Sequence, residues 1–190
     1  MTTPNEKKIA VILPGIGYTC DRPLLYYSGK MAQALGWEVL RVPYGGFPEK
    51  VRGDARKMKQ SADLAFQQTA DALKNVQWEQ YARILFIGKS VGTVVATAYA
   101  YAKGLSCRHI LFTPVEATFS YPMGDAVAFH GTADPWAETP VIKRLCQQAN
   151  IPLHLTENAN HSLETGDVAR DVQNLALILR QAEAFLTARA

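Results

Sequence analysis

The segment Gly88-Lys89-Ser90-Val91-Gly92 places a serine between two glycines, each two positions away. It follows a short apolar run and precedes an alanine-rich segment, which is the strand, turn and helix context of the G-x-S-x-G nucleophile motif. A serine at the apex of such a tight turn stands clear of the backbone, and small residues on either side let the strand and the helix approach closely. We therefore predict that Ser90 is a catalytic nucleophile.

The same residues could instead end a phosphate-binding P-loop, which has the pattern G-x-x-x-x-G-K-[ST]. That motif needs a glycine five residues before Gly88, and Arg83 occupies this position. The predicted strand also runs directly into Gly88, so no loop remains to wrap around a phosphate. The sequence therefore argues against a P-loop.

Two further reactive residues follow later strands. Asp134 lies a few residues past a predicted strand, where a carboxylate can orient an imidazole. A turn formed by Asp134 and Pro135 is the structural alternative. His161 lies in a polar loop before the last predicted helix, where it could act as a general base, although a lone loop histidine is usually only solvated. Because serine, aspartate and histidine follow successive strand ends in this order, we predict a hydrolase triad.

Four other residues have a possible role near this site. Glu116, which follows the fourth predicted strand, is the alternative acid of the triad. His130 precedes Asp134 by too few residues to be the base, and we expect it to pack at a strand end. Tyr18 and Trp136 either line an acyl pocket or pack in the core, and the sequence leaves both roles open.

These residues require a scaffold that brings strand ends together. Several predicted strands are continuous apolar runs, which are typical of strands buried on both faces. The predicted strands are residues 9–13, 37–42, 83–87, 109–113, 126–130 and 153–156, and the predicted helices are residues 23–35, 55–76, 91–103, 138–149 and 164–188. This alternation predicts an α/β fold: a three-layer sandwich with a mostly parallel six-stranded sheet. Function in such sheets gathers beyond the carboxyl ends of the strands.

Length and composition exclude several other classes of protein. A chain of 190 residues fits a single domain, which we expect to span residues 1–190. The net charge is only +3 and the basic residues are scattered, so we expect no nucleic-acid partner. Three cysteines without C-x-x-C spacing argue against a disulfide framework and against a zinc site. The apolar run near the N-terminus is too short for a signal peptide or a membrane span, so we expect a cytoplasmic protein without membrane contact.

Three segments make the sequence similar to the α/β-hydrolase superfamily, specifically to its short members. They are Gly88-Lys-Ser-Val-Gly92, His130-Gly-Thr-Ala-Asp134 and Asn160-His161, and the resemblance covers nearly the whole chain. It implies the strand order 2-1-3-4-5-6. It also implies that Ser90 is the nucleophile, Asp134 the orienting carboxylate, and His161 the general base and then the general acid.

The resemblance also indicates where an oxyanion hole would lie. One donor is the backbone N–H of Val91, and the second comes from the loop after the first strand. Ile16 is the preferred second donor, with Gly17 and Tyr18 as alternatives, and Pro14 stands where the family commonly has histidine. This loop and the loop after the fifth strand supply the residues that we expect to contact substrate, which are Gly15, Gly17, Tyr18 and Trp136.

The predicted reaction is the hydrolysis of an ester or thioester of a modest soluble small molecule through an acyl-enzyme. No metal or organic cofactor is needed. Only about a dozen residues, 114–125, stand where larger relatives insert a lid, so we expect an open site, with residues 44–53 as a partial flap. The alternatives are a triad hydrolase of C–C or amide bonds and a non-catalytic protein of this fold that binds a ligand or partner. The oligomeric state is left open.

Overall fold

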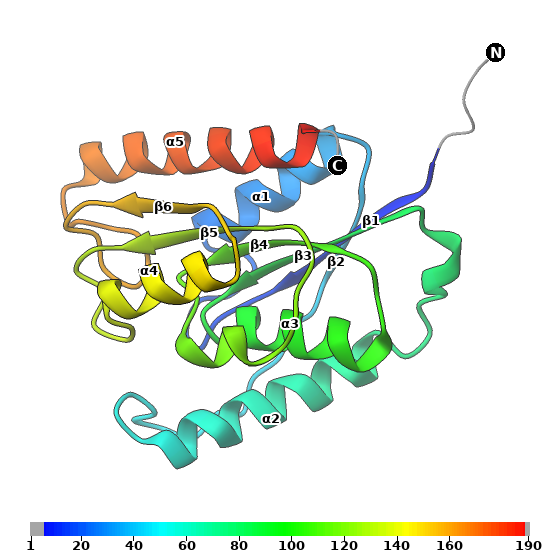
Figure 1. The fold of residues 1–190 in the computed structure, drawn as a ribbon, viewed down its shortest axis with the longest axis horizontal. Helices are drawn as coiled ribbons and strands as arrows, with labels where there is room; N and C mark the ends of the chain where they lie inside the picture. The colour runs from blue at the N-terminus through cyan, green and yellow to red at the C-terminus, as the bar shows by residue number, and fades with distance from the viewer. Residues whose placement is uncertain (1–5, 189–190) are drawn as a thin grey trace.

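The protein is described by a computed structural model that covers residues 6–188, in which helices flank a single sheet (Figure 1). The strands are β1 (Lys8–Leu13), β2 (Glu38–Arg41), β3 (Arg83–Lys89), β4 (Arg108–Phe112), β5 (Ala126–Gly131) and β6 (Leu153–Thr156). The α-helices are α1 (Pro23–Ala34), α2 (Ala55–Ala72), α3 (Val91–Lys103), α4 (Thr139–Gln148) and α5 (Val168–Thr187). Short 3-10 helices at Trp78–Gln80 and Glu116–Ser120 lie in the connections.

The strand order is β2-β1-β3-β4-β5-β6, as predicted. Every neighbouring pair is parallel, so the sheet, which we expected to be mostly parallel, is entirely parallel over the described residues. Leu13 of β1 pairs with Gly88 of β3, and Phe112 of β4 pairs with Lys89. The segment that carries Ser90 therefore leaves the sheet between two flanking strands.

Both faces of the sheet are covered, which explains why the strands are continuous apolar runs. Successive side chains of a strand point to opposite faces. Ala10 and Ile12 of β1 belong to one buried cluster, with residues of α1 and α5, while Ile9, Val11 and Leu13 belong to another, with residues of α2 and α3. Figure 1 shows α1 and α5 on one side of the sheet and α2, α3 and α4 on the other. The predicted three-layer α/β sandwich is confirmed.

Helix α2 begins where the Asp54 carboxylate accepts a hydrogen bond of 3.0 Å from the N–H of Lys57. It ends at Ala72, four residues before the predicted end. The N–H of Val76 bonds to the carbonyl of Leu73 at 3.1 Å, and this turn replaces the last helical turn that we predicted.

Helix α5 begins at Val168 and not at residue 164, which corrects the prediction. Asp167 caps it by accepting a hydrogen bond of 3.1 Å from the N–H of Arg170. The carboxylate of Asp171 accepts hydrogen bonds from the backbone N–H groups of Thr165, at 2.6 Å, and Gly166, at 3.2 Å. These bonds hold residues 164–166 in a loop that adjoins His161.

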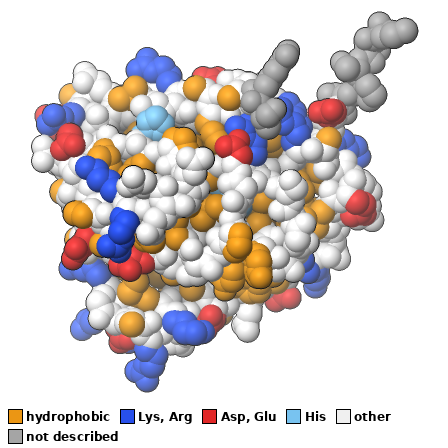
Figure 2. Space-filling view, in the orientation of Figure 1, with side chains coloured by type: hydrophobic (Ala, Val, Ile, Leu, Met, Phe, Trp, Pro, Cys, Tyr) orange, Lys and Arg blue, Asp and Glu red, His pale blue; other side chains and the backbone are white. Residues whose placement is uncertain are grey.

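The surface carries charges of both signs. Figure 2 shows basic and acidic side chains interspersed over the visible face. Within residues 6–188, none of the helices combines the length and the apolar character that a bilayer crossing demands.

Candidate active site

Ser90 occupies the turn between β3 and α3 in an unusual backbone conformation. Its φ is 56° and its ψ is −121°, values that a residue with a side chain adopts rarely. Such strain costs about 1–3 kcal/mol and persists only where the surrounding structure enforces it. The N–H of Ser90 donates to the carbonyl of Phe112 at 3.0 Å, which ties the turn to β4.

The two glycines of the motif allow a close backbone approach. A Cβ atom on Gly88 would lie 2.6 Å from the carbonyl oxygen of Gly92. A Cβ atom on Gly92 would lie 2.1 Å from the carbonyl oxygen of Leu13 in β1. Both distances are far below van der Waals contact, so any side chain there would push α3 away from the sheet.

The structure brings the three predicted triad residues together. The Oγ atom of Ser90 lies 2.8 Å from Nε2 of His161, and Nδ1 of His161 lies 2.7 Å from Oδ2 of Asp134. Ser90, Asp134 and His161 follow β3, β5 and β6 respectively. A hydroxyl, an imidazole and a carboxylate joined in this order match the geometry of a hydrolase triad, and their catalytic roles stay a prediction.

A close contact between two loops holds Asp134 beside His161. A Cβ atom on Gly131 would lie 2.2 Å from the carbonyl oxygen of Ala159, and the N–H of Ala133 donates to that same oxygen at 2.9 Å. The loop after β5 and the loop after β6 are thereby joined at residues that lie one to three positions from Asp134 and His161. Sequence reasoning missed this role of Gly131, although a glycine at the end of a buried strand is a usable signal.

The surroundings of Asp134 keep its carboxylate ionised. Burial, which leaves its side chain 0% exposed, would by itself raise the pKa of Asp134. The hydrogen bond from His161 and a backbone hydrogen bond of 2.8 Å from Trp136 outweigh this effect and hold the pKa of Asp134 below its usual value. Asp134 can therefore accept the Nδ1 proton of His161 and fix the tautomer of the ring.

The surroundings of His161 favour the neutral form of its imidazole. Burial lowers its pKa, and the charge of Lys89 acts in the same direction, while the hydrogen bond to Asp134 opposes them. The indole of Trp136 stacks on the imidazole, with ring centres 5.3 Å apart and planes inclined by 23°. Trp136 therefore both shields His161 from solvent and fixes the plane of its ring.

Lys89, which the sequence reasoning did not single out, is the last residue of β3 and has a buried side chain. Its side chain is among the largest fully buried ones, at 1% exposure. Its Nζ atom lies 5.1 Å from the centre of the Tyr18 ring. Burial lowers the pKa of Lys89 to about 7, although the carboxylates of Asp134 and Glu164 oppose this shift.

The predicted oxyanion donors border the same space as Ser90. Val91 and Ile16 both line the cavity that contains Ser90. Gly15 and Tyr18 exchange backbone hydrogen bonds of 3.0 and 3.2 Å, which closes a turn around Ile16 and Gly17. Within the described part of the chain, the N–H groups of Val91 and Ile16 have no hydrogen-bond acceptor. Their role as oxyanion donors stays a prediction.

The other residues expected to contact substrate fall in different places. A Cβ atom on Gly15 would lie 3.2 Å from Cβ of Ser90, so Gly15 adjoins the nucleophile, and Gly17 has open space around it. Trp136 lines the cavity at Ser90. Tyr18 does not line this cavity: it is 7% exposed, belongs to the core cluster beside α1, and accepts a hydrogen bond of 3.1 Å from the N–H of Leu24.

The cavity at Ser90 has a volume of about 470 Å³. Its walls are mostly apolar and come from α2, α3 and the segment after β4; they include Ala55, Met58, Ala62, Val94, Val115 and Ala117. At its outer end, Lys59 and Asp63 form an exposed ion pair of 2.6 Å.

Hydrogen bonds fix the wall formed by residues 116–120. The hydroxyls of Thr93 in α3 and Thr118 lie 2.6 Å apart, and the hydroxyl of Thr97 donates to the carbonyl of Thr118 at 3.0 Å. This segment is therefore fastened to α3 by buried polar contacts.

The segment 44–53, expected as a partial flap, is also fastened. The Tyr44 hydroxyl donates to the carbonyl of Pro14, and the backbone of Gly45 makes two hydrogen bonds to the Gln68 side chain, at 3.1 and 2.9 Å. Val51 from this segment lines the cavity.

The alternative acid, Glu116, is exposed and lines the cavity, and the carboxylate bonded to His161 is that of Asp134. His130 packs at the end of β5, as expected, with its Nε2 atom 3.2 Å from Oγ1 of Thr139. Its Nδ1 atom lies 3.7 Å from Oδ2 of Asp134. Over residues 6–188, no group of three or more histidine, cysteine or acidic side chains gathers as a metal site would require.

Sequence comparisons find no relatives: no family model matches the chain, and none of the curated proteins does. Comparison of structures, in contrast, finds many similar folds. An α/β serine hydrolase homologue from Coxiella burnetii superposes with a TM-score of 0.66 at 19% identity, covering 94% of this chain and 87% of that one.

Two further structures are similar over nearly the whole chain. Est1E from Butyrivibrio proteoclasticus, solved with ferulic acid bound, has a TM-score of 0.68 at 13% identity and covers 97% of this chain and 90% of its own. A lidless α/β serine hydrolase from Xanthomonas campestris has a TM-score of 0.65 at 13% identity, with coverages of 99% and 88%. With the topology described above, these likenesses show that the chain has the fold of the α/β-hydrolase superfamily.

Proposed function

We propose that the protein is a serine hydrolase that cleaves a carboxylic ester through an acyl-enzyme on Ser90. One observation carries this proposal: Ser90, His161 and Asp134 are joined by hydrogen bonds of 2.8 and 2.7 Å at the carboxyl edge of the sheet. The fold of known serine hydrolases adds support.

Acylation begins when Nε2 of His161 takes the proton of the Ser90 hydroxyl while Oγ attacks the substrate carbonyl carbon. The carbonyl electron pair moves onto oxygen, and the N–H groups of Val91 and Ile16 stabilise the negative charge. When the tetrahedral intermediate collapses, the bond to the leaving group breaks and His161 donates its proton to the departing oxygen. Asp134 stabilises the imidazolium that forms in between.

Deacylation repeats these steps with water. His161 takes a proton from a water molecule, whose oxygen attacks the acyl carbon. Collapse of the second intermediate breaks the bond to Ser90, and His161 returns its proton to Oγ. The products are a carboxylic acid and an alcohol, and the protein regains its starting state.

The cavity at Ser90 supports an uncharged, apolar acyl group. Most of its wall is aliphatic, and the one basic residue that lines it, Lys59, is paired with Asp63. The carboxylate of Glu116 also borders the cavity and would repel an acidic acyl group. A neutral aliphatic or aromatic acyl chain needs no basic partner and is not repelled by Glu116.

The proposal is tested with p-nitrophenyl esters and a fluorophosphonate probe, which labels activated serines. We expect the wild-type protein to be labelled and active, and Ser90→Ala to be unlabelled, with kcat lowered by roughly 10⁴-fold or more. Ser106→Ala is the matched control, because Ser106 is exposed on the connection between α3 and β4. Retained activity in Ser90→Ala would refute the nucleophile. A folded wild-type protein that is neither labelled nor active would favour the non-catalytic alternative.

A further inference from the structure

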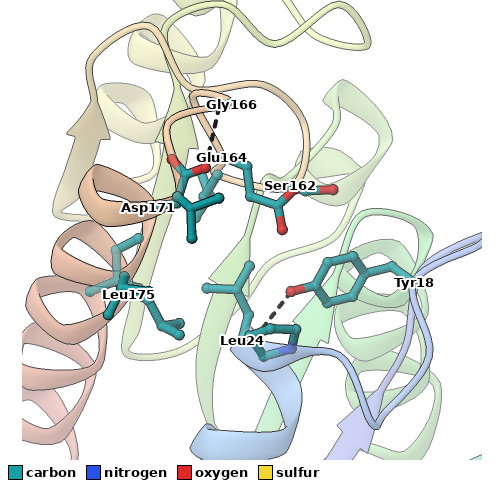
Figure 3. Close-up of a pocket in the computed structure, with 12 residues that line it drawn as sticks. Tyr18, Leu24, Ser162, Glu164, Gly166, Asp171 and Leu175 are labelled. Carbon is teal, nitrogen blue, oxygen red and sulfur yellow. Dashed lines mark hydrogen bonds between the residues drawn. The ribbon is translucent and has the colours of Figure 1, made fainter.

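A second cavity, of about 420 Å³, lies on the face of the sheet that α1 and α5 cover (Figure 3). Its lining includes Tyr18 and Leu24 near the start of α1, Leu175 on α5, and Ser162 and Glu164 on the loop between β6 and α5. Figure 3 shows Glu164 and Ser162 above this space, Leu175 and Tyr18 on its two sides, and Leu24 below it. The reaction proposed above gives this cavity no role.

The two cavities border neighbouring residues of the same segments, the turn after β1 and the loops that carry Asp134 and His161. Ile16 lines the cavity at Ser90 and Tyr18, two residues further along the same turn, lines the second. Trp136, which stacks on His161, lines the first, and Ser162, which follows His161, lines the second. One cavity thus lies on each face of the sheet, and each borders residues next to Ser90 or His161 in the sequence or in space.

We propose that the second cavity is the subsite for the leaving group and that it takes the apolar alcohol portion of a neutral ester. This inference rests on the proposed function. It divides the substrate into an acyl part, bound beside α2 and α3, and an alcohol part, bound between α1 and α5.

The direction of proton transfer supports this division. His161 must donate its proton to the leaving oxygen, which therefore has to lie beside Nε2. With the acyl chain in the cavity at Ser90, the rest of the alcohol extends past His161 towards the residues that follow it. Those residues, Ser162 to Glu164, border the second cavity.

The walls of the second cavity indicate the chemistry of the alcohol. Leu24, Leu163 and Ile178 form a buried apolar floor, with 2–3% exposure each. The carboxylates of Glu164 and Asp171 also line it, and hydrogen bonds from Thr165 and Gly166 lower the pKa of Asp171, so this group is ionised at neutral pH. The buried ammonium of Lys89 lies at the Tyr18 ring, and Lys89 is not among the residues that line the cavity. Apolar alcohols fit this lining, whereas phosphate-bearing thiols would be repelled.

The test varies the alcohol and keeps the acid constant, using the ethyl, butyl and hexyl esters of butanoic acid. These alcohols have similar basicity, so differences in kcat/KM report binding of the chain. We expect kcat/KM to rise from ethyl to hexyl, by at most about fourfold for each added methylene. An ester whose alcohol ends in a carboxylate should be hydrolysed more slowly than the hexyl ester.

Leu175→Trp fills the cavity and should lower kcat/KM for the hexyl ester while sparing the ethyl ester. Leu177→Trp is the matched control, because Leu177 lies on the same helix, is 49% exposed and does not line the cavity. If Leu175→Trp does not fold, Val172→Trp at the 61% exposed mouth replaces it.

Two failures can be told apart. Equal kcat/KM for the ethyl and hexyl esters, or an equal loss of kcat/KM for both esters in Leu175→Trp, would overturn the leaving-group subsite. Ser90-dependent hydrolysis of ethyl butanoate would at the same time uphold the proposed function. Absence of hydrolysis of every ester by the folded wild-type protein would overturn both.

Discussion

The ammonium nitrogen of Lys89 lies 5.1 Å from the centre of the Tyr18 ring, on the face of the sheet that α1 and α5 cover. Lys89 immediately precedes Ser90, and Tyr18 closes the turn that contains Ile16. A cation–π contact thus joins the two segments that would form the oxyanion hole. Because Lys89 is 1% exposed, its charge acts on its neighbours through a medium of low polarity.

This charge predicts the acid limb of the pH profile. The proposed mechanism requires neutral His161. The value of kcat/KM should therefore be maximal at pH values above the pKa of His161 and should fall as the pH decreases below that pKa. Burial, and then the charge of Lys89, lower that pKa, so the midpoint should lie below the ordinary histidine value of about 6.5. Removing the charge with Lys89→Met should raise the midpoint.

The kcat/KM profiles of the wild type and of Lys89→Met should converge well above pH 7. Because burial lowers the pKa of Lys89 to about 7, the wild-type side chain is mostly neutral at such pH values. Glu164, Asp134 and His130 also contribute to the local field, and all remain in the variant. Lys143→Met, at an exposed site on α4, is the control. A uniform loss of kcat/KM at all pH values, without a shift of the acid limb, would show that Lys89 only fills space.

Replacing the triad acid separates the two candidate carboxylates. Asp134→Asn removes the acceptor that fixes the His161 tautomer, so kcat should fall by roughly 10⁴-fold. Glu116→Gln should change kcat far less, because Glu116 is exposed and makes no hydrogen bond to His161 among the described residues. Steady-state kinetics on one p-nitrophenyl ester compare the two, and the reverse ranking would make Glu116 the acid.

The length of the cavity at Ser90 predicts a preferred acyl chain. Ala55, Met58 and Ala62 form one stripe of α2 along it, about 10 Å long at ~1.5 Å per residue. Each methylene adds roughly 1.3 Å to an extended chain, given carbon–carbon bonds of ~1.5 Å. Among p-nitrophenyl esters, kcat/KM should therefore rise from acetate and level off near about eight acyl carbons.

Ala62→Trp should move this plateau to shorter chains by blocking the outer part of the cavity. Ala72→Trp is the matched control on the same helix, since Ala72 is exposed and does not line the cavity. A wild-type profile that is flat from acetate to dodecanoate would show that the acyl chain lies elsewhere.

The close approach of α3 to β1 predicts the effect of one methyl group on stability. In Gly92→Ala, the new Cβ atom would lie 2.1 Å from the Leu13 carbonyl oxygen, so the free energy of unfolding should fall by about 3 kcal/mol or more. Gly45→Ala, where no atom lies within 4 Å of the new Cβ, should change it by less than about 0.5 kcal/mol. Urea denaturation measures both, and similar values for the two variants would contradict the contact.

Much of the fold could be predicted because its signals are local. The β3 sequence is an apolar run that leads into Gly88. Gly88 and Gly92 are required because backbone atoms lie where a Cβ atom would stand, and the G-x-S-x-G motif contains both glycines. The order of Ser90, Asp134 and His161 then follows from parallel strands, whose carboxyl ends meet at one edge.

Other features depend on contacts between distant segments. The start of α5 is delayed by Asp171, whose carboxylate holds the backbone of Thr165 and Gly166 and so competes with helix formation. Tyr18 lines the second cavity and not the cavity at Ser90, because its ring contacts Lys89 and its hydroxyl accepts a hydrogen bond from Leu24 on the face of the sheet that α1 covers. Sequence patterns over a few residues do not reveal contacts between segments that lie far apart in the chain.

Ser90 and His161 are 71 positions apart in the sequence, and this distance has a consequence for partly folded forms of the protein. The contacts that hold the turn at Ser90 come from β1 and β4, whereas His161 follows β6, so the pair also needs β5 and β6 in the sheet. In a nascent or partly unfolded chain, Ser90 would therefore lack the hydrogen bond to His161. If Ser90 is the nucleophile, hydrolytic activity therefore requires the complete fold. Local unfolding of β6 alone should abolish activity before the rest of the protein unfolds.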